Sequence, residues 1–246
     1  MYSDTERRHA LEVLAAAASV SEASRRTGIN RRTLERWRDA PDPFRGDCPT
    51  CDGSELAEVA YSALLGFYLG DGHIARMARY YALRVSCDNA YPTVMEDVEA
   101  VIRAVHPRRP VFRVAAIGCT VVVSHWQHWP CVFPQHGPGR KHERPIILDE
   151  WQASIVRAHP APFLRGLFHS DGARSRNWTR RIVAGEWKRY DYPRWQFTNN
   201  SVEIRELCCW ALDLVEVPWR QSNWKTISVS TRAGVARLDA LIGLKS

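Results

Sequence analysis

The chain has 246 residues, of which 45% are hydrophobic and 25% charged, a composition typical of a folded globular protein. Its formal net charge of +7 indicates a polyanionic partner such as nucleic acid or an acidic surface. No uninterrupted apolar run reaches the roughly 20 residues of a membrane span, and the polar first residues do not resemble a secretory signal. We therefore expect a cytoplasmic chain, and its odd number of seven cysteines argues against a disulfide framework.

The first forty residues contain a helical pattern with a glycine turn. Residues 5–17 are rich in alanine and predict a helix, and Gly28 permits the left-handed turn between two further helices that Ser21 and Asn30 can cap. This stretch resembles a helix-turn-helix domain with residues 30–38 as the recognition helix. The resemblance implies DNA contacts from the arginines of that helix, Arg31, Arg32, Arg36 and Arg38. The alternative is a basic helical hairpin that packs against the rest of the chain.

A short cysteine motif follows that pattern. The stretch Pro41-Asp42-Pro43 ends the last helix, and the loop after it carries the pair Cys48 and Cys51. Two cysteines at this spacing are half of a structural zinc site, which needs two more ligands. The candidates are Cys87, Cys119, Cys131 or a histidine. The alternative is a turn with two reduced thiols.

Two stretches one hundred residues apart organise the remaining chain. They are Leu64-Leu65-Gly66-Phe67-Tyr68-Leu69-Gly70-Asp71-Gly72 and Leu164-Arg165-Gly166-Leu167-Phe168-His169-Ser170-Asp171-Gly172. Each is an apolar run with small residues at its third and seventh places, and each ends in Asp-Gly. The small residues recur four apart and so share one helix face, which allows two such helices to approach closely. We therefore predict that these helices pack together and bring Asp71 and Asp171 side by side.

The elements after each motif repeat in order, which indicates an internal duplication and a pseudo-twofold domain. The first half predicts a helix over residues 55–70, a strand over 80–87, a helix over 91–105 and a hairpin over 111–115 and 118–124. The second half predicts a helix over 162–170, strands over 181–184 and 194–198, a helix over 202–214, a strand over 224–230 and a last helix over 233–244. Residues 83–86 align with residues 195–198 in this repeat. We predict four parts: a domain over residues 1–40, a linker over 41–54, and two halves over 55–158 and 159–246.

A loop rich in glycine, proline and histidine separates the two halves. It contains Arg140 and Lys141, and four basic residues within a short span favour contact with phosphates. Its histidines show no recognised metal-ligand spacing, so we expect a solvated loop that faces DNA.

Two adjacent carboxylates repel each other unless they share a cation. Mg²⁺ suits such a pair, because it binds one or two carboxylates together with water and substrate phosphates. A metal held there supports in-line hydrolysis of a phosphodiester. The negative ends of the two helix dipoles favour a cation further.

At Asp71, Asp171 and the glycines before them, the chain resembles the single-chain, two-motif form of the LAGLIDADG homing endonucleases. The resemblance covers about residues 55–246. It implies an α+β fold, a pseudo-twofold pair of αββαββα subdomains with a β-saddle on double-stranded DNA, preceded here by the small all-α domain. It also implies a monomer that cleaves DNA with a divalent metal and is associated with the nucleoid.

The resemblance carries further residues into the site. The expected metal ligands are Asp71 and Asp171 with Gly70 and Ser170 beside them, and the expected catalytic residues add Lys225 and Gln196 to the two acids. Base-reading positions of the saddle fall on Arg84 and Arg194. The lysine expected in the first half has no counterpart, because Thr120 occupies the nearest register. Two other functions stay open: a transcriptional regulator that binds DNA without cutting it, and an RNA-splicing maturase.

Overall fold

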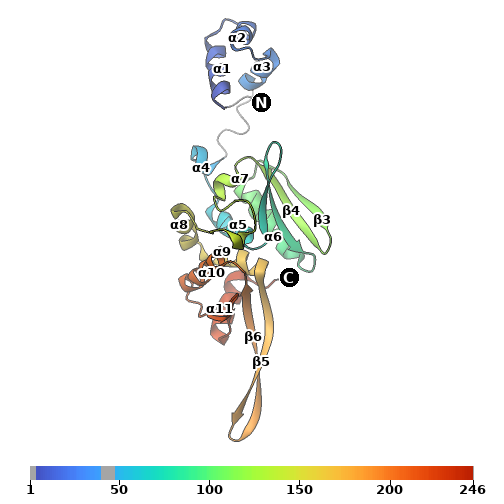
Figure 1. Cartoon of the computed structure of the whole chain (residues 1–246), viewed down its shortest axis with the longest axis vertical. Helices are drawn as coiled ribbons and strands as arrows, with labels where there is room; N and C mark the ends of the chain where they lie inside the picture. Colours follow the sequence, from blue (N-terminus) through green and yellow to red (C-terminus); the bar gives the residue numbers. More distant parts are fainter. Residues whose placement is uncertain (1–3, 40–47, 246) are drawn as a thin grey trace. The chain divides into compact units, whose positions relative to one another are not determined.

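The computed structural model describes residues 4–39 and 48–245, whose course is drawn in Figure 1. Contacts between residues divide the chain into two compact units, residues 1–54 and 55–246. The predicted helix end at Pro41-Asp42-Pro43 and the linker residues 41–47 lie outside the described residues. Within the described ranges, no helix is long and apolar enough to cross a membrane.

The amino-terminal unit contains three helices around a small core, as predicted. They are α1 (Asp4–Ala16), α2 (Val20–Thr27) and α3 (Arg31–Asp39), and a one-turn helix α4 (Pro49–Asp52) follows. The core residues are Ala10, Leu14, Ala23, Ile29 and Leu34, with Val20 and Trp37 packed against them.

The ends of these helices show which capping predictions hold. Gly28 has φ +70° and its N–H donates to the carbonyl of Ser24, so the left-handed turn is confirmed. Asn30 caps α3, because its Oδ1 accepts from the N–H of Arg32 at 2.9 Å. The prediction for α2 was wrong by two residues: its cap is Ser19, whose hydroxyl accepts from the N–H of Glu22.

The second unit is built from two halves with the same order of elements, which confirms the α+β pseudo-twofold fold. The first half is α5 (Glu58–Leu69), β1 (Gly72–Arg76), β2 (Tyr81–Asp88), α6 (Pro92–Val105), β3 (Val111–Ala116) and β4 (Cys119–Trp126). The connection holds α7 (Trp129–Val132), a 3-10 turn η1 (Lys141–Glu143) and α8 (Glu150–Ala158). The second half is α9 (Pro160–Asp171), β5 (Gly172–Val183), β6 (Glu186–Thr198), α10 (Val202–Leu214), β7 (Arg220–Asn223), β8 (Thr226–Val229) and α11 (Arg232–Ile242).

Each half carries one antiparallel four-stranded sheet. The strand orders are β1-β2-β4-β3 and β5-β6-β8-β7, so the two sheets are topological copies. The first pairs of the two sheets are in equivalent register, since Gly72 pairs with Val85 and Gly172 with Phe197. The predicted alignment of residues 83–86 with 195–198 is therefore confirmed.

The motif helices α5 and α9 pack against each other through their glycines. A Cβ added to Gly66 would lie 2.3 Å from the carbonyl oxygen of Phe163, and one added to Gly166 would lie 2.3 Å from that of Ala63. No side chain fits at such distances, so the backbones touch directly. The predicted close approach of the two helices is confirmed.

The first strands of the second half are much longer than predicted. Strands β5 and β6 have 12 and 13 residues and form a continuous hairpin that extends away from the helices in Figure 1. Its turn is Ala184-Gly185, both with positive φ, as a two-residue hairpin turn requires. The sequence predicted only the ends of this hairpin, and it did not predict strands β1 and β7 or the short helices α4, α7 and α8.

Candidate nuclease site

The ends of α5 and α9 place the two acids of the repeat against each other. Helix α5 ends at Leu69 and α9 at Asp171, and Gly70 and Ser170 occupy equivalent places. A Cβ on Gly70 would lie 2.3 Å from the Cβ of Ser170 and 3.6 Å from Oδ2 of Asp171. The end of the first motif therefore lies directly beside the carboxylate of the second.

The two carboxyl groups are electrostatically unusual. Asp71 remains open to solvent on one side, yet partial burial raises its pKa to about 6, and the charge of Asp171 adds to the rise. Burial also raises the pKa of Asp171, although a hydrogen bond from Asn199 and the charges of Lys141 and Lys245 act in the opposite direction. An added cation would relieve the repulsion, which is the behaviour expected of a metal-binding pair.

Lys141 lies at the end of α5 rather than in solvent. Its ammonium donates to the carbonyl oxygens of Tyr68, Leu69, Gly70 and Gly72, four backbone acceptors around one group with three N–H donors. These carbonyls carry the partial negative charge of the helix end. Burial lowers the pKa of Lys141 to about 8, while the two aspartates raise it. The sequence predicted that Lys141 belongs to a solvated loop that contacts phosphates. The structure differs from this prediction, because the Lys141 ammonium is bound by backbone carbonyls at the end of α5.

A second lysine is bound at the matching point of the other motif helix. Lys245 donates to the carbonyl of Ser170 at 3.1 Å, and its ammonium stands 4.8 Å from the centre of the Tyr91 ring. Both carbonyls that the resemblance assigns to a metal therefore accept from a lysine. The positions attract cations in both halves.

The register of the two sheets shows which residues occupy equivalent positions near Asp71 and near Asp171. Thr120 pairs with Cys87 in the first sheet, and the carbonyl of Lys225 accepts from the N–H of Asn199 in the second. Since Val85 matches Phe197, Cys87 matches Asn199 and Thr120 matches Lys225. This register agrees with the expectation that the first half lacks a lysine on this strand.

Asn199 is a site residue that the sequence reasoning did not identify. Its Nδ2 donates to Oδ2 of Asp171 at 2.6 Å. The first half has the thiol of Cys87 at this position, and burial, followed by the charge of Asp71, raises the pKa of that thiol to about 12. Asn199 directly follows the strand predicted over residues 194–198. The predicted alignment of the two halves, extended by one residue, would therefore have pointed to it.

The remaining expected residues lie on the sheets and the connection. Gln196 and Arg84 occupy equivalent places on β6 and β2, with partly exposed side chains, and Arg194 lies two residues before Gln196. Arg140 is exposed in the connection. In the amino-terminal unit, Arg31, Arg32 and Arg36 are all exposed on α3.

An open cavity of about 1120 Å³ is lined by Asp171 and by Gly70 and Gly72, the two neighbours of Asp71 in the chain. Its lining combines the end of α5, the first strand pair, the connection and the second sheet. The polar residues among its walls include His73, Arg76, Arg140, Lys141, Arg144, Asp171, Asn199 and Lys225. Of the predicted site residues, its lining brings together Gly70, Arg140, Lys141, Asp171 and Lys225. The lining does not include Asp71, Ser170, Gln196, Arg84, Arg194 or the helix-turn-helix arginines.

The chemistry of the donor set fits a hard divalent cation. Two carboxylates with raised pKa and the carbonyls of Gly70 and Ser170 offer only oxygen ligands, which Mg²⁺ and similar ions prefer. The ammonium groups on both carbonyls show that positive charge is favourable there. The carboxylates of Asp71 and Asp171 are the residues that would hold the ion.

Comparison with known proteins gives the following relatives. A family model described as a homeodomain-like domain matches residues 1–42, and no curated protein matches the chain. The structure of I-DmoI in complex with DNA and Mn is similar at 10% sequence identity and a TM-score of 0.49, with 77% of this chain and 98% of that chain covered. The homing endonuclease I-WcaI bound to its DNA recognition sequence has 14% identity and a TM-score of 0.45, with coverage of 77% and 82%. The LAGLIDADG meganuclease I-AabMI bound to uncleaved DNA has 11% identity and a TM-score of 0.45, with coverage of 74% and 82%. The chain is thus similar in structure to LAGLIDADG homing endonucleases, with a homeodomain-like helix-turn-helix region at its amino-terminal end.

Proposed function

We propose that this chain is an endonuclease that hydrolyses phosphodiester bonds of a specific double-stranded DNA site with a divalent metal. The observation that carries the proposal is the pair Asp71 and Asp171, held together by touching helix backbones, with Asp171 on the wall of an open cavity. Two neighbouring carboxyls with raised pKa have no structural use at a helix end, where they add repulsion. They are useful where a cation and a phosphate bind.

The two acids, Asn199 and Lys225 have different roles in the proposed reaction. A divalent ion at the two acids would stabilise the negative charge that develops on the reacting phosphate. Asn199 holds Asp171 through the hydrogen bond to its Oδ2, and so fixes the direction of that carboxylate. Lys225 opens onto the same cavity, where its ammonium can neutralise a phosphate oxygen or orient water.

Lys141 takes the corresponding role in the first half. The matching strand position holds Thr120, which has no charge, so the basic group must come from another segment. The ammonium of Lys141 stands at the end of α5 within the electrostatic reach of both acids. In this position it holds the helix end and supplies positive charge to the first-half side of the site.

The long hairpin β5–β6 is suited to contact with DNA. Residues 172–198 contain seven basic and two acidic residues. The ring of Trp178 is 53% exposed and lies near the guanidinium groups of Arg180 and Arg189, at 5.7 and 5.1 Å. A ribbon of arginines and aromatic rings can follow the backbone and bases of a duplex.

The helix-turn-helix adds a second DNA contact in this proposal. Changing Arg31, Arg32 and Arg36 together to alanine should weaken binding and reduce the slope of log affinity against log salt by about 1 for each lost phosphate contact. Arg157→Ala removes an exposed arginine on α8 and serves as the control. An unchanged slope in the triple variant would show that these arginines do not touch DNA.

Cleavage of a randomised plasmid library in the presence of Mg²⁺ tests the central claim. The wild-type chain should cut a restricted set of sites, and Asp71→Asn or Asp171→Asn should reduce the rate about 10³-fold, because each change removes a charged metal ligand worth several kcal/mol. Glu150→Gln makes a similar change at a carboxylate whose side chain is 83% exposed on α8, and should cut normally. Tight, metal-independent binding without cutting under any metal would refute the nuclease and favour a regulator.

A further inference from the structure

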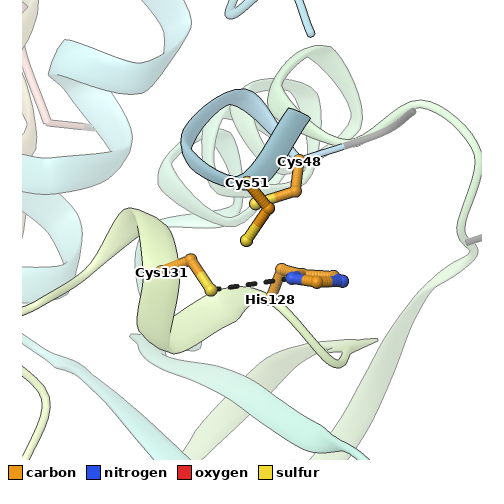
Figure 2. Close-up of side chains that lie close together, drawn as sticks. All are labelled: Cys48, Cys51, His128 and Cys131. Atoms are coloured by element: carbon orange, nitrogen blue, oxygen red, sulfur yellow. Dashed lines mark hydrogen bonds between the residues drawn. The ribbon is translucent and has the colours of Figure 1, made fainter. Parts of the chain in front are cut away.

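Four side chains of the types that bind metals lie together outside the acid pair in Figure 2: Cys48, Cys51, His128 and Cys131. Their ligand atoms all lie within 4.8 Å of one another. The Sγ of Cys131 is 3.6 Å from Nδ1 of His128. The motif Cys48-x-x-Cys51, which supplies only two ligands, thus finds the two further ligands that a structural zinc site needs.

The two ligand pairs are built in the same way. Cys48 directly precedes α4 and Cys51 is its third residue, while His128 directly precedes α7 and Cys131 is its third residue. The N–H of Cys51 donates to the carbonyl of Cys48 at 3.1 Å, and the N–H of Cys131 donates to that of His128 at 2.9 Å. Each one-turn helix therefore presents its two ligands toward the other pair.

The surroundings hold both turns in place. Trp129 of α7 is fully buried and its Nε1 donates to the carbonyl of Ser124 at 3.0 Å, and the carbonyl of Val132 accepts from the hydroxyl of Tyr61 at 2.6 Å. On the other side, Asp52 accepts from the N–H of Cys48 at 3.2 Å and closes the α4 turn. Because α7 is anchored in the core of the first half, His128 and Cys131 are positioned before any metal binds.

The distances match a tetrahedral ion. Bonds of about 2.3 Å to sulfur and about 2.0 Å to nitrogen place neighbouring ligand atoms roughly 3.6–3.8 Å apart. The contact between Cys131 and His128 has this length, and the other pairs, which are at most 4.8 Å apart, reach it by a contraction of roughly 1 Å at most. All seven cysteines lie in the described residues and none forms a disulfide, so the three sulfurs of the group are thiols.

We infer that Cys48, Cys51, His128 and Cys131 bind one structural Zn²⁺ ion. Three thiolates and one imidazole are ligands that Zn²⁺ favours, whereas Mg²⁺ requires oxygen. Four protein ligands leave no open coordination position, so the ion stabilises the structure and takes no part in catalysis. The ion joins residues 48–51 to residues 128–131. The zinc inference is independent of the nuclease proposal, because the two sites have no residue in common.

Metal content and a cobalt spectrum test the inference directly. The full-length chain, purified without chelator, should contain one zinc per chain. Co²⁺ exchanged into the chain should give the visible bands of a tetrahedral thiolate site. Cys51→Ser and Cys131→Ser should each lose most of the zinc. Cys209→Ser, a partly exposed cysteine on α10 outside the group, should keep it. Zinc content that stays unchanged in both ligand variants would overturn the assignment.

Further readouts separate zinc from a disulfide and from a folding defect. Alkylation of the denatured, unreduced wild-type chain should modify all seven cysteines, and modification of only five would indicate a disulfide and refute the site. Cys51→His keeps a zinc ligand at this position and should retain zinc that Cys51→Ser loses. A chelator should lower the Tm of the wild-type chain, and Zn²⁺ but not Mg²⁺ should restore it. A wild-type chain without zinc, without a cobalt spectrum and with an unchanged Tm would also refute the inference.

Discussion

Asp71 and Asp171 end equivalent helices, but they stand among different neighbours. In the second half, Asp171 accepts a hydrogen bond from Asn199, and the N–H of Asn199 donates to the carbonyl of Lys225, in the turn before β8. In the first half, the same two register positions hold Cys87 and Thr120, neither of which carries a charge at neutral pH. The positive charges that act on Asp71 come instead from Lys141, in the connection between the halves, and from Lys245.

The difference shows which features of a duplicated fold are hard to change. The touching backbones at Gly66 and Gly166 tolerate no side chain in either half, so both motifs keep glycine there. The polar lining of the site depends on side chains that point into an open cavity, where one group can replace another. The fold therefore stays symmetric, while the chemistry around its two acids has become asymmetric.

Lysine variants test this asymmetry with the largest expected effect. Lys141→Met and Lys225→Met should each slow cleavage about 10²-fold, since each removes a positive charge near a reacting phosphate. If each lysine serves its own half, the two variants should slow opposite strands of the duplex. A strand-resolved nicking assay on an end-labelled target measures both rates.

A lysine on the hairpin gives the matched control for that assay. Lys188→Met removes the same charge from β6, far along the strand from Gln196, and should weaken DNA binding without a strand preference. Equal slowing of both strands by Lys141→Met would contradict its assignment to the first half.

An exchange of the small residues tests the structural side of the comparison. Gly70→Ser alone should lower the free energy of unfolding by about 2 kcal/mol, because its Cβ would overlap that of Ser170. Ser170→Gly should have little effect, since Oγ of Ser170 has no hydrogen-bond partner among the described residues. The double variant should recover most of the loss, as urea denaturation can show.

Gly137→Ser is the control for the exchange. Its nearest neighbour would be the flexible side chain of Arg144 at 3.4 Å, so its stability should stay close to that of the wild type. If the double variant is no more stable than Gly70→Ser, the overlap with Ser170 is not the cause of the loss.

The sequence predicted the features that repeat along the chain. Spacing alone placed the glycines on one helix face, and the alignment of residues 83–86 with 195–198 gave the register that relates Arg84 to Gln196. It could not predict the long hairpin, because most residues of β5 and β6 are exposed on both faces and show no apolar alternation. The contacts of Lys141 and the proximity of Cys48 to His128 join segments that are far apart in the sequence, so no local sequence pattern could predict them.

In the second half, Asp239 of α11 is hydrogen-bonded to Arg174 of β5 and Trp195 of β6, and a change at Asp239 should have the smallest effect on stability. Asp239 accepts from Arg174 at 2.9 and 2.8 Å and from Nε1 of Trp195 at 2.7 Å. Burial alone would raise the pKa of Asp239, but these hydrogen bonds and the charge of Arg174 outweigh it and lower the pKa.

The ion pair of Asp239 with Arg174 is partly exposed, so Asp239→Asn should reduce the free energy of unfolding by only about 1 kcal/mol at pH 7. A carboxyl with a lowered folded-state pKa stabilises the fold above its unfolded pKa of about 4, and this contribution disappears as the pH falls through the folded-state pKa. The stability difference between wild type and Asp239→Asn should therefore shrink when urea denaturation is repeated from pH 7 down to pH 3, and a difference that is constant over this range would show that the charge of Asp239 does not contribute.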